Sequence, residues 1–277
     1  MAKLGIDLGG TNVRAALLEE DVLSEIHSIP VNKTNGRDSV LEQIVTLVEQ
    51  FEKDTLEGIG IGVPSYVDID QGIVYDTVNL PGWDAVPLKA IIESKFHLPV
   101  SVNNDANCFA LGEKYYGKGK PYSSLVGITL GTGVGAGIII NGQLYAGQNC
   151  GAGEIGALPY RDRDYEFYAG GSFFTEIHKT TAREAFEMSK QGDKKALKIF
   201  NAYGHHLGEL IKLVLLTYDP EAIILGGSIS NAWKYFSESM TTSLHQFLFK
   251  QYIKNLKIEV SSLDNAGIYG AAHLVGN

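Results

Sequence analysis

The sequence predicts an α/β fold made of two similar halves that face each other across a cleft. The main observation is a repeat: strand, glycine-rich turn, strand, strand and then helices occur twice, starting near residues 3 and 124. Each glycine-rich turn, at 9–12 and at 131–137, joins two short apolar runs that are typical of strands. No low-complexity linker separates the halves, so we expect them to be packed together and hinged.

The first half is expected to begin with three strands and to continue with alternating helices and strands. Apolar runs bounded by polar turns predict the strands, and apolar residues at helical spacing predict the helices. Asp70-Gln-Gly72 separates two short runs, as expected for a hairpin. The predicted strands are 4–8, 13–18, 23–29, 58–63, 67–69, 73–75 and 100–103, and the predicted helices are 37–53, 88–96 and 106–116.

The second half repeats the opening strands and is then mainly helical. Asn141-Gly142 is a strong signal for a two-residue hairpin. Residues 146–170 are polar and rich in glycine, which predicts a loop, and Pro220 ends a long amphipathic helix. The predicted strands are 125–130, 137–140, 143–145, 222–225 and 258–260, and the predicted helices lie within 172–190 and at 193–218, 233–249 and 266–275.

Composition and charge restrict the classes of function. A chain of 277 residues, 44% of them hydrophobic, can bury the cores of two ordinary domains. A net charge of −9 disfavours nucleic acid or an anionic membrane as the main partner. Its two cysteines, Cys108 and Cys150, are too few for a disulfide framework or a cysteine-rich zinc site. Because the sequence shows no signal peptide and no membrane-length apolar run, we expect a cytoplasmic protein.

The two glycine turns indicate phosphate chemistry. A turn without Cβ atoms at its tip lets backbone N–H groups approach an anion closely. Two such turns, about 120 residues apart, suggest that one phosphate chain is held from two sides. We therefore predict a nucleotide-using enzyme whose halves close on each other. The residues expected to bind phosphates are Gly9, Gly10, Thr11, Asn12, Gly131, Thr132 and Gly133.

The order of the motifs resembles the ROK family of sugar kinases, within the superfamily of hexokinase, actin and the Hsp70 ATPase domain. The matching segments are 7–14, 79–83, 103–113, 130–137, 151–156, 225–230 and 266–272. The resemblance implies two ribonuclease-H-like (actin-like ATPase) domains, which we place at 1–115 and 116–277. The last helix, about 266–277, is expected to pack back on the first domain. The resemblance also implies ATP and Mg²⁺ as cofactors, a small-molecule sugar as substrate and, by analogy, a homodimer.

Asp105 is the predicted catalytic base. Phosphoryl transfer needs positioning, charge neutralisation and a group that accepts the proton of the attacking hydroxyl. A carboxylate at the start of a helix can accept that proton, and the resemblance indicates the same residue. From the residues alone, Asp105 could instead cap the following helix. Asp7, at the end of the first strand, is expected to hold Mg²⁺ through water, or else to hydrogen-bond the Gly9-Gly10 turn.

The sugar and the adenosine are expected at further polar and glycine positions. Carboxylates and amides pair with sugar hydroxyls. Together with the resemblance, this selects Asn79, Asn104, Asp105, Glu154 and Glu166 as sugar ligands. Glu166 is equally well interpreted as a solvated loop carboxylate, because its alignment with the family crosses a gap. Gly226-Gly227 either lets adenosine approach the backbone or forms an ordinary turn, and Arg14 either contacts phosphate or forms an ion pair.

The chain departs from the family pattern on the sugar side. Most ROK proteins carry a structural zinc held by one histidine and three cysteines. Ala157 stands where that histidine is expected, and the segment that follows is short and lacks cysteine, so we expect no zinc. Ser65 also replaces a glycine expected near the sugar. These changes leave the phosphate residues intact, so they affect the choice of sugar more than the expectation of kinase activity.

The expected activity is therefore hexose phosphorylation, with the 6-hydroxyl of glucose as the default acceptor. A fructokinase or an N-acetylhexosamine kinase is the alternative within enzymes. A sugar-responsive regulator or a non-catalytic sugar sensor is the alternative from another class. A regulator would need a DNA-binding module, and the first glycine turn already begins at residue 9. The presence of Asp7, Asp105 and both turns argues against a sensor without turnover.

Overall fold

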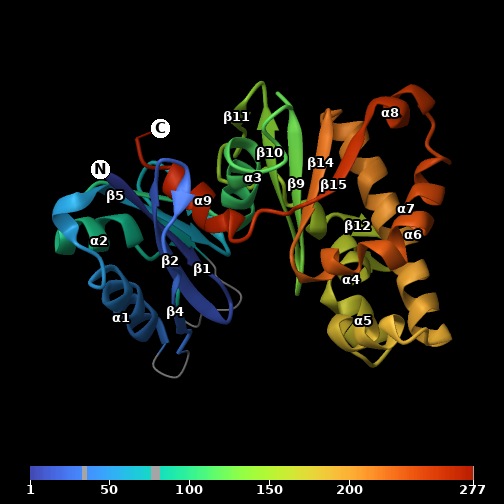
Figure 1. Cartoon of the computed structure of the whole chain (residues 1–277), viewed down its shortest axis with the longest axis horizontal. Helices are drawn as coiled ribbons and strands as arrows, with labels where there is room; N and C mark the ends of the chain where they lie inside the picture. Colours follow the sequence, from blue (N-terminus) through green and yellow to red (C-terminus); the bar gives the residue numbers. More distant parts are fainter. Residues whose placement is uncertain (33–35, 76–81, 277) are drawn as a thin grey trace.

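The molecule consists of five layers along its longest axis. The computed structural model describes residues 1–32, 36–75 and 82–276. Two sheets alternate with three layers of helices, and the two termini lie on the side of the first sheet (Figure 1). Helices α1 (Gly36–Val48) and α2 (Leu88–Phe96) cover the outer face of the first sheet, and α3 (Asp105–Tyr115) and α9 (Ala266–His273) lie between the sheets.

The two sheets share one strand order, as the sequence repeat predicts. The order is β3-β2-β1-β5-β8 in the first sheet and β11-β10-β9-β14-β15 in the second. In each half an antiparallel hairpin opens the sheet and parallel strands follow. The first sheet contains β1 (Ala2–Leu8), β2 (Asn12–Glu19), β3 (Val22–Leu23), β5 (Leu56–Val63) and β8 (Val100–Asn104), with β4 (His27–Pro30) paired to β2. The second contains β9 (Leu125–Leu130), β10 (Val134–Ile140), β11 (Gln143–Leu144), β14 (Ala222–Gly226) and β15 (Lys257–Val260).

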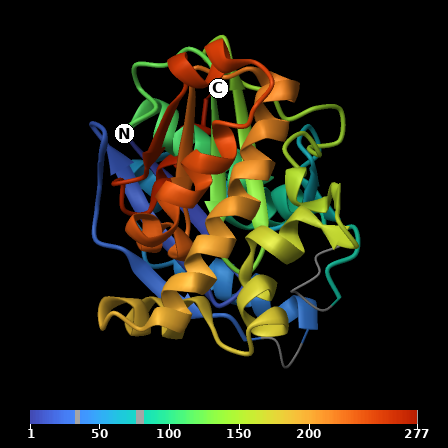
Figure 2. The ribbon, with the colours of Figure 1, turned by 90° about the vertical axis from the view of Figure 1, so that its right-hand side faces the viewer.

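The outer face of the second sheet is covered by α6 (Lys194–Tyr218) and α7 (Trp233–Leu244), which lie side by side (Figure 2). Asp193 caps α6 by accepting a hydrogen bond from the N–H of Ala196 at 2.8 Å. Tyr203 and Leu207 of this helix are fully buried at helical spacing, so the periodic pattern that predicted it reflects its packing. Among the described helices, none is long and apolar enough to cross a bilayer.

The prediction of a loop at 146–170 was wrong in its second part. β12 (Pro159–Tyr160) and β13 (Arg163–Asp164) form a hairpin that leads into α4 (Tyr165–Ala169). Asp164 caps α4 by accepting a hydrogen bond from the N–H of Phe167 at 2.7 Å. The ring of Tyr160 stacks on that of Tyr165 at 4.3 Å. A helix cap and an aromatic pair order this segment. Neither produces a periodic pattern of apolar residues in the sequence, so the polar composition wrongly indicated a loop.

Several other element boundaries differ from prediction. The strand predicted at 23–29 is divided into β3 and β4, because the Ser24 hydroxyl accepts the Leu17 N–H at 3.0 Å between them. The helix predicted at 37–53 ends at Val48, and the one predicted at 233–249 ends at Leu244. The remaining β-strands and α-helices of the described residues are β6 (Tyr66–Asp68) and β7 (Ile73–Tyr75), which form the predicted hairpin, α5 (Ala182–Lys190) and α8 (Lys250–Asn255).

Glycines allow the middle layer to lie close to both sheets. α9 packs on the first sheet, and a Cβ built on Gly60 of β5 would lie 1.7 Å from the carbonyl oxygen of Ala271. α3 packs on the second sheet, and a Cβ built on Gly137 of β10 would lie 2.5 Å from the Cβ of Ala110. Each half therefore contributes a helix that packs against the sheet of the other half. Because α3 contacts both halves, the domain boundary at residue 115 stays a prediction.

The helices α3 and α9 also touch each other at glycines. A Cβ on Gly270 of α9 would lie 1.7 Å from the carbonyl oxygen of Cys108 in α3. A Cβ on Gly112 of α3 would lie 2.0 Å from the carbonyl oxygen of Ala266 in α9. Side chains larger than hydrogen would force the helices apart. This crossing fixes the start of each helix relative to both sheets.

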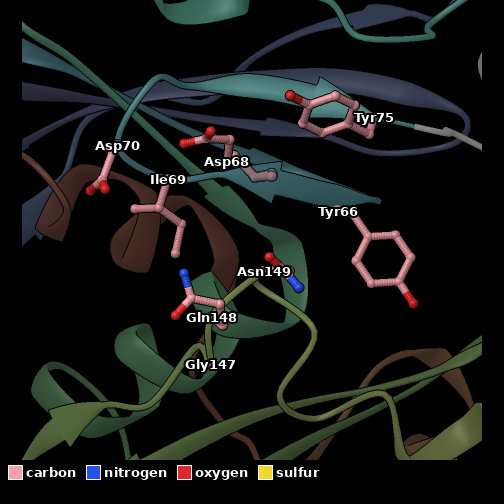
Figure 3. Close-up of a pocket in the computed structure, with 9 residues that line it drawn as sticks. Tyr66, Asp68, Ile69, Asp70, Tyr75, Gly147, Gln148 and Asn149 are labelled. Atoms are coloured by element: carbon pink, nitrogen blue, oxygen red, sulfur yellow. The ribbon is translucent and has the colours of Figure 1, made fainter.

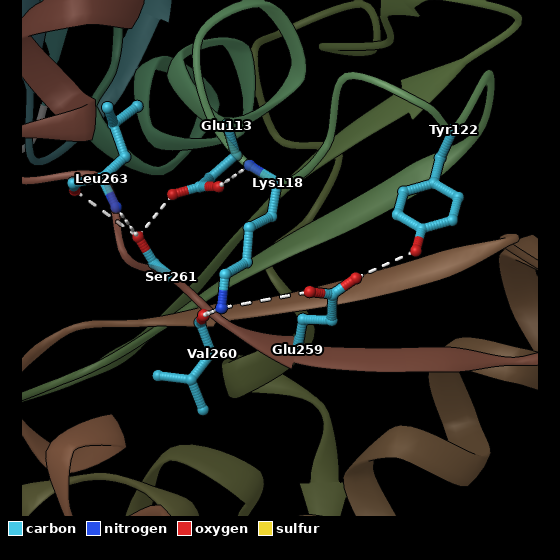
Figure 4. Close-up of polar contacts among 7 residues, drawn as sticks. All are labelled: Glu113, Lys118, Tyr122, Glu259, Val260, Ser261 and Leu263. Atoms are coloured by element: carbon cyan, nitrogen blue, oxygen red, sulfur yellow. Dashed lines mark hydrogen bonds and ion pairs between the residues drawn. The ribbon is translucent and has the colours of Figure 1, made fainter.

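A polar network holds the segment that leads from β15 to α9 (Figure 4). The buried carboxylate of Glu113, in the last turns of α3, accepts hydrogen bonds from the Ser261 hydroxyl and, at 3.0 Å, from the N–H of Lys118. The ammonium of Lys118 donates to the carbonyl oxygen of Val260 at 2.6 Å. Burial raises the pKa of Glu113, and the hydrogen bonds oppose that shift. The network thus anchors the chain where it crosses to α9.

Gly270→Ala is expected to lower the free energy of unfolding by about 2 kcal/mol or more, because the new methyl overlaps the backbone of α3. Chemical denaturation followed by circular dichroism measures the change. Gly10→Ala is the matched control, since a Cβ on Gly10 would meet no heavy atom within 4 Å. Equal stability of the two variants would show that the helix crossing tolerates separation and does not fix the fold.

Candidate active site

The parallel strands of the first sheet bring residues of two predicted motifs into one row, with Gly62 between them. Asp7 of β1 lies beside Gly62 of β5, which lies beside Asn103 of β8. All three stand near the carboxyl ends of their strands, where open α/β sheets form their sites. Asp105 comes two residues after Asn103. A Cβ built on Gly62 would lie 3.7 Å from the Cα atom of Asp105. The register therefore places Asp105 at the same edge of the sheet as Asp7.

Asn104, rather than Asp105, is the N-cap of α3. Its Oδ1 atom accepts hydrogen bonds from the N–H groups of Ala106 at 2.8 Å and Asn107 at 3.3 Å. Asp105 is the first residue of the helix, and its Oδ1 atom also accepts the Ala106 N–H, at 2.8 Å. Its Oδ2 atom has no hydrogen-bond partner among the described residues. One carboxylate oxygen of Asp105 is thus left open for a ligand.

The environment of Asp105 disfavours its negative charge. Its pKa is raised from the ordinary 3.8 to about 7, first by burial and then by the negative charge of Asp7, while the hydrogen bond from Ala106 opposes the shift. The charge of Glu154 adds a smaller upward contribution. A carboxylate with a pKa near neutrality is suited to accept a proton from an alcohol at physiological pH.

Asp7 and Arg14 form an ion pair beside the first glycine turn. Arg14 Nη2 lies 2.5 Å from Asp7 Oδ2, and Nη1 donates to Asn265 Oδ1 at 3.1 Å. Of the two roles left open for Arg14, the structure therefore contains the ion pair. The turn itself is closed by the N–H of Gly9, which donates to the carbonyl oxygen of Asn12 at 2.9 Å. Asp7 Oδ1 has no hydrogen-bond partner among the described residues.

Glu166 lies against the second glycine turn. Its Oε2 atom accepts a hydrogen bond from the N–H of Val134 at 3.0 Å, where β10 begins, three residues earlier than the predicted strand and directly after Gly133. The N–H of Gly171 donates to the carbonyl oxygen of Thr132 at 3.0 Å, so the residues after α4 also hold the turn. Glu166 lies in α4 rather than in a loop, but it is exposed, so its interpretations as a sugar ligand and as a solvated carboxylate both stay predictions.

Glu154 interacts electrostatically with two other carboxylates: its charge affects the pKa of Asp105, and the charge of Glu166 affects its own pKa. Its side chain is accessible to solvent, yet protein surrounds it closely enough that desolvation raises its pKa, and the charge of Glu166 raises it further. The charges of Asp7, Asp105, Glu154 and Glu166 thus affect one another in succession, from the first glycine turn to the second, and we call this set the line of carboxylates. Among the described residues, no three His, Cys, Asp or Glu side chains are close enough to hold a metal ion.

The tips of both glycine turns leave open space. A Cβ on Gly10 or on Gly131 would meet no heavy atom within 4 Å, and neither residue has a positive φ. The folded chain itself therefore does not require glycine at these two positions. A ligand that approaches the backbone closely would require it, as the phosphate prediction states.

Gly226 and Gly227 lie next to the second turn, and both have structural reasons to be glycine. Gly226 pairs with Thr129 in the parallel register, and a Cβ on it would lie 2.4 Å from the ring of Phe109. Gly227 has a φ of 81°, which favours glycine, and packs against the carbonyl group of Leu130. Their predicted contact with adenosine stays a prediction.

One network near Asp105 was not predicted from the sequence. The thiol of Cys150 donates to Asn103 Oδ1 at 3.3 Å, and Asn107 Nδ2 donates to the same oxygen at 2.9 Å. The network joins the loop that carries Glu154 to the segment that carries Asp105. Asn103 and Cys150 are 47 positions apart and belong to no periodic pattern, so the sequence offered no signal for the contact. The predicted sugar ligand Asn79 lies outside the described residues.

Comparison with known proteins gives the same family across the whole length. A family model described as ROK family matches residues 3–277. The chain is 30% identical to a glucokinase from Halalkalibacterium halodurans, over 98% of this chain and 94% of that protein. It is 28% identical to an N-acetyl-D-glucosamine kinase from Vibrio cholerae, over 98% of each. It is also 28% identical to a xylose repressor from Bacillus subtilis, over 98% of this chain and 76% of that protein.

Solved structures share the complete layered architecture. A putative sugar kinase from Cytophaga hutchinsonii matches with a TM-score of 0.88 and 29% identity over all of both chains. A ROK family glucokinase from Streptomyces griseus, solved with glucose and AMPPNP, matches with a TM-score of 0.85 and 25% identity over 99% of both chains. These matches confirm the predicted α/β fold of two actin-like domains.

Asp105→Asn is expected to stabilise the protein at and above neutral pH. A carboxyl group with a pKa near 7 in the folded state and 3.8 in the unfolded state binds more protons when folded. Its contribution to stability therefore falls as the pH rises between these values. The side-chain amide of the Asn variant does not ionise, so the variant does not lose stability in this way. Its free energy of unfolding at pH 8 should exceed that of wild type by on the order of 1–4 kcal/mol.

Urea denaturation of wild type and Asp105→Asn between about pH 5 and pH 8 measures this difference. The advantage of the variant should shrink as the pH is lowered through the interval. A difference that does not change with pH would contradict the raised pKa of Asp105.

Proposed function

The chain belongs to the ROK family and is a carbohydrate kinase, and we propose that it transfers the γ-phosphoryl group of ATP to a hydroxyl group of a hexose. The 6-hydroxyl of glucose is the default acceptor, because glucokinases are among its similar relatives. The observation that carries this proposal is the line of carboxylates between the two glycine turns, with Asp105 and its pKa near 7 within it.

Asp105 is proposed to accept the proton of the attacking hydroxyl. Its Oδ2 atom is open, and its other oxygen is held by the first turn of α3, so the carboxylate has a fixed direction. As the acceptor oxygen attacks the γ-phosphoryl group, the bond from that group to ADP breaks, ADP leaves, and the proton of the hydroxyl passes to Asp105. A base with a pKa near 7 can both take up this proton and release it to water after the reaction.

The glycine turns and Asp7 fit the phosphate groups and their metal ion. The open tips at Gly10 and Gly131 allow phosphate oxygens to reach backbone N–H groups. Asp7 has one oxygen paired with Arg14 and one open oxygen, which suits a Mg²⁺ ion bound through water. Such an ion would neutralise charge on the phosphate oxygens.

The acceptor is proposed to lie between Asp105, Glu154 and Glu166, with Asn79 and Asn104 as further ligands. Glu154 presents an accessible carboxylate that can pair with two hydroxyl groups. Asn104 uses its Oδ1 atom to cap α3 and donates from Nδ2 to the carbonyl oxygen of Ser65 at 3.3 Å. Only its second amide hydrogen remains for the sugar.

A panel of hexoses with ATP and Mg²⁺ in a coupled ADP assay tests the function and its alternatives. Glucose is expected to be turned over. Preferential turnover of N-acetylglucosamine, N-acetylmannosamine or fructose would instead select one of the alternative kinases. N-acetylglucosamine is the first alternative sugar to test, because the similar protein from Vibrio cholerae is an N-acetyl-D-glucosamine kinase. Binding of a sugar without ADP release would select a regulator or sensor, as the likeness to a xylose repressor suggests.

Asp105→Asn is expected to lower kcat by at least about 100-fold with little change in the KM for sugar, because it removes the proton acceptor and keeps the shape. In the wild type, kcat/KM should rise with pH around pH 7, since the base must be ionised. Circular dichroism confirms that the variant is folded. Near-normal turnover of the variant would remove Asp105 from the mechanism.

Gly10→Ala is expected to raise the KM for ATP about tenfold or more while the free energy of unfolding stays within about 0.5 kcal/mol of wild type. The methyl group would fill the space proposed for phosphate oxygens and would touch nothing else in the structure. Steady-state kinetics at saturating sugar measures the effect. An unchanged KM for ATP would show that the first turn does not hold the nucleotide.

A further inference from the structure

A cavity of about 660 Å³ lies between the β6–β7 hairpin and the loop at 147–149 (Figure 3). The hairpin forms one wall, and Gln148 and Asn149 project from the loop on the opposite side. The volume is within the range of pockets that take small molecules. The hairpin belongs to the first half of the chain and the loop to the second, so a ligand here would contact both halves.

The cavity adjoins the site proposed for the acceptor sugar. Tyr66, which lines it, has a ring carbon 3.4 Å from the position of a Cβ on Gly151, three residues before Glu154. Asn104, the residue before Asp105, donates from Nδ2 to the carbonyl oxygen of Ser65 at 3.3 Å, and Ser65 directly precedes Tyr66 of the lining. The walls of the cavity are therefore tied directly to the residues next to Asp105 and Glu154.

The lining has the chemistry of a site for neutral polyhydroxyl groups. It combines the aromatic rings of Tyr66 and Tyr75 with the carboxylate of Asp70 and the amides of Gln148 and Asn149. No lysine or arginine is among the described residues that line it, and the two aspartates, Asp68 and Asp70, would repel phosphate. Aromatic faces suit the apolar faces of a sugar ring, and carboxylates and amides accept or donate hydrogen bonds to its hydroxyls.

The polar groups of this lining are not used within the protein. Among the described residues, no hydrogen bond or ion pair engages the side chains of Asp70, Gln148 or Asn149. Asp68 differs, because it accepts hydrogen bonds from Gln71 and so shapes the turn of the hairpin. Three polar side chains around one cavity thus remain available to a ligand, and their replacement removes no internal hydrogen bond or ion pair among the described residues.

We propose that this cavity is a second saccharide subsite, and that the preferred acceptor is a hexose that carries a second neutral sugar ring. The inference rests on the proposed kinase function. The first ring would present its hydroxyl to Asp105, and the second would extend over Tyr66 to Asp70 and Asn149. Because the subsite spans the two halves, its occupation would favour their closure on the substrate.

The experiment compares glucose with glucose disaccharides of different linkage, namely maltose, cellobiose, gentiobiose and sucrose. Two measurements are made: ADP release with ATP and Mg²⁺, and equilibrium binding by calorimetry without nucleotide. At least one disaccharide is expected to bind at least tenfold more tightly than glucose and to have a kcat/KM at least tenfold higher.

The double variant Asp70→Ala/Asn149→Ala tests the subsite itself. It should weaken binding of that disaccharide about tenfold or more, through KM rather than kcat, and change the values for glucose less than twofold. Asp54→Ala/Asn201→Ala is the matched control, since both residues are exposed and neither lines the cavity. The control should leave both sugars unaffected.

The outcomes separate this inference from the kinase function. Turnover of glucose with no disaccharide bound more tightly would overturn the subsite and leave the function intact. Disaccharide binding that is lost in the double variant, without turnover of any sugar, would support the subsite and overturn the function. An equal loss for glucose and disaccharide in the double variant would also reject the subsite, because it would place Asp70 and Asn149 at the first ring.

Discussion

The close crossing of α3 and α9 is the constraint on which the site depends. The two helices approach each other and the sheets at Gly60, Gly112 and Gly270, where no Cβ could be accommodated without displacement of backbone. The first residue of α3 is Asp105, and the residue before α9 is Asn265, which binds Arg14 of the Asp7 ion pair. A change in the crossing would therefore move the proposed base and the first glycine turn relative to each other. Helix packing away from the proposed substrate site therefore sets the position of Asp105 relative to the first glycine turn.

Burial of acidic side chains in the line of carboxylates lowers the stability of the folded protein and gives Asp105 the pKa that suits its proposed role as a base. Burying Asp105 beside Asp7 raises its pKa, so ionising it in the folded protein is unfavourable. Unpaired acidic groups of this kind are not expected from folding alone, since a neutral side chain of the same shape would be more stable there. The arrangement is understandable if the negative charges face substrate hydroxyls and a magnesium–nucleotide complex, which compensate them when bound.

The sequence predicted the features that depend on local pattern. The repeat, the glycine turns and the long helix ending before Pro220 all follow from periodicity and turn chemistry, and the structure contains them. The features that were missed depend on contacts between distant residues. The α4 segment is ordered by aromatic contacts, and Cys150 reaches Asn103 across 47 positions. The contact of Glu166 with Val134 belongs to the same class, because it required the placement of α4 against the second turn.

Ser65, one of the departures from the family pattern, adjoins the cavity. Ser65 precedes Tyr66 of the cavity lining, its hydroxyl donates to the Tyr75 carbonyl oxygen, and its own carbonyl oxygen accepts Asn104 Nδ2. The backbone around the first glycine turn, by contrast, keeps the residues that the family resemblance implies. The departure at Ser65 thus falls beside the site proposed for the acceptor, whereas the residues proposed to hold phosphate agree with the resemblance. Such a division lets one phosphoryl-transfer apparatus serve different sugars, because selectivity resides in contacts that need not move the reacting atoms.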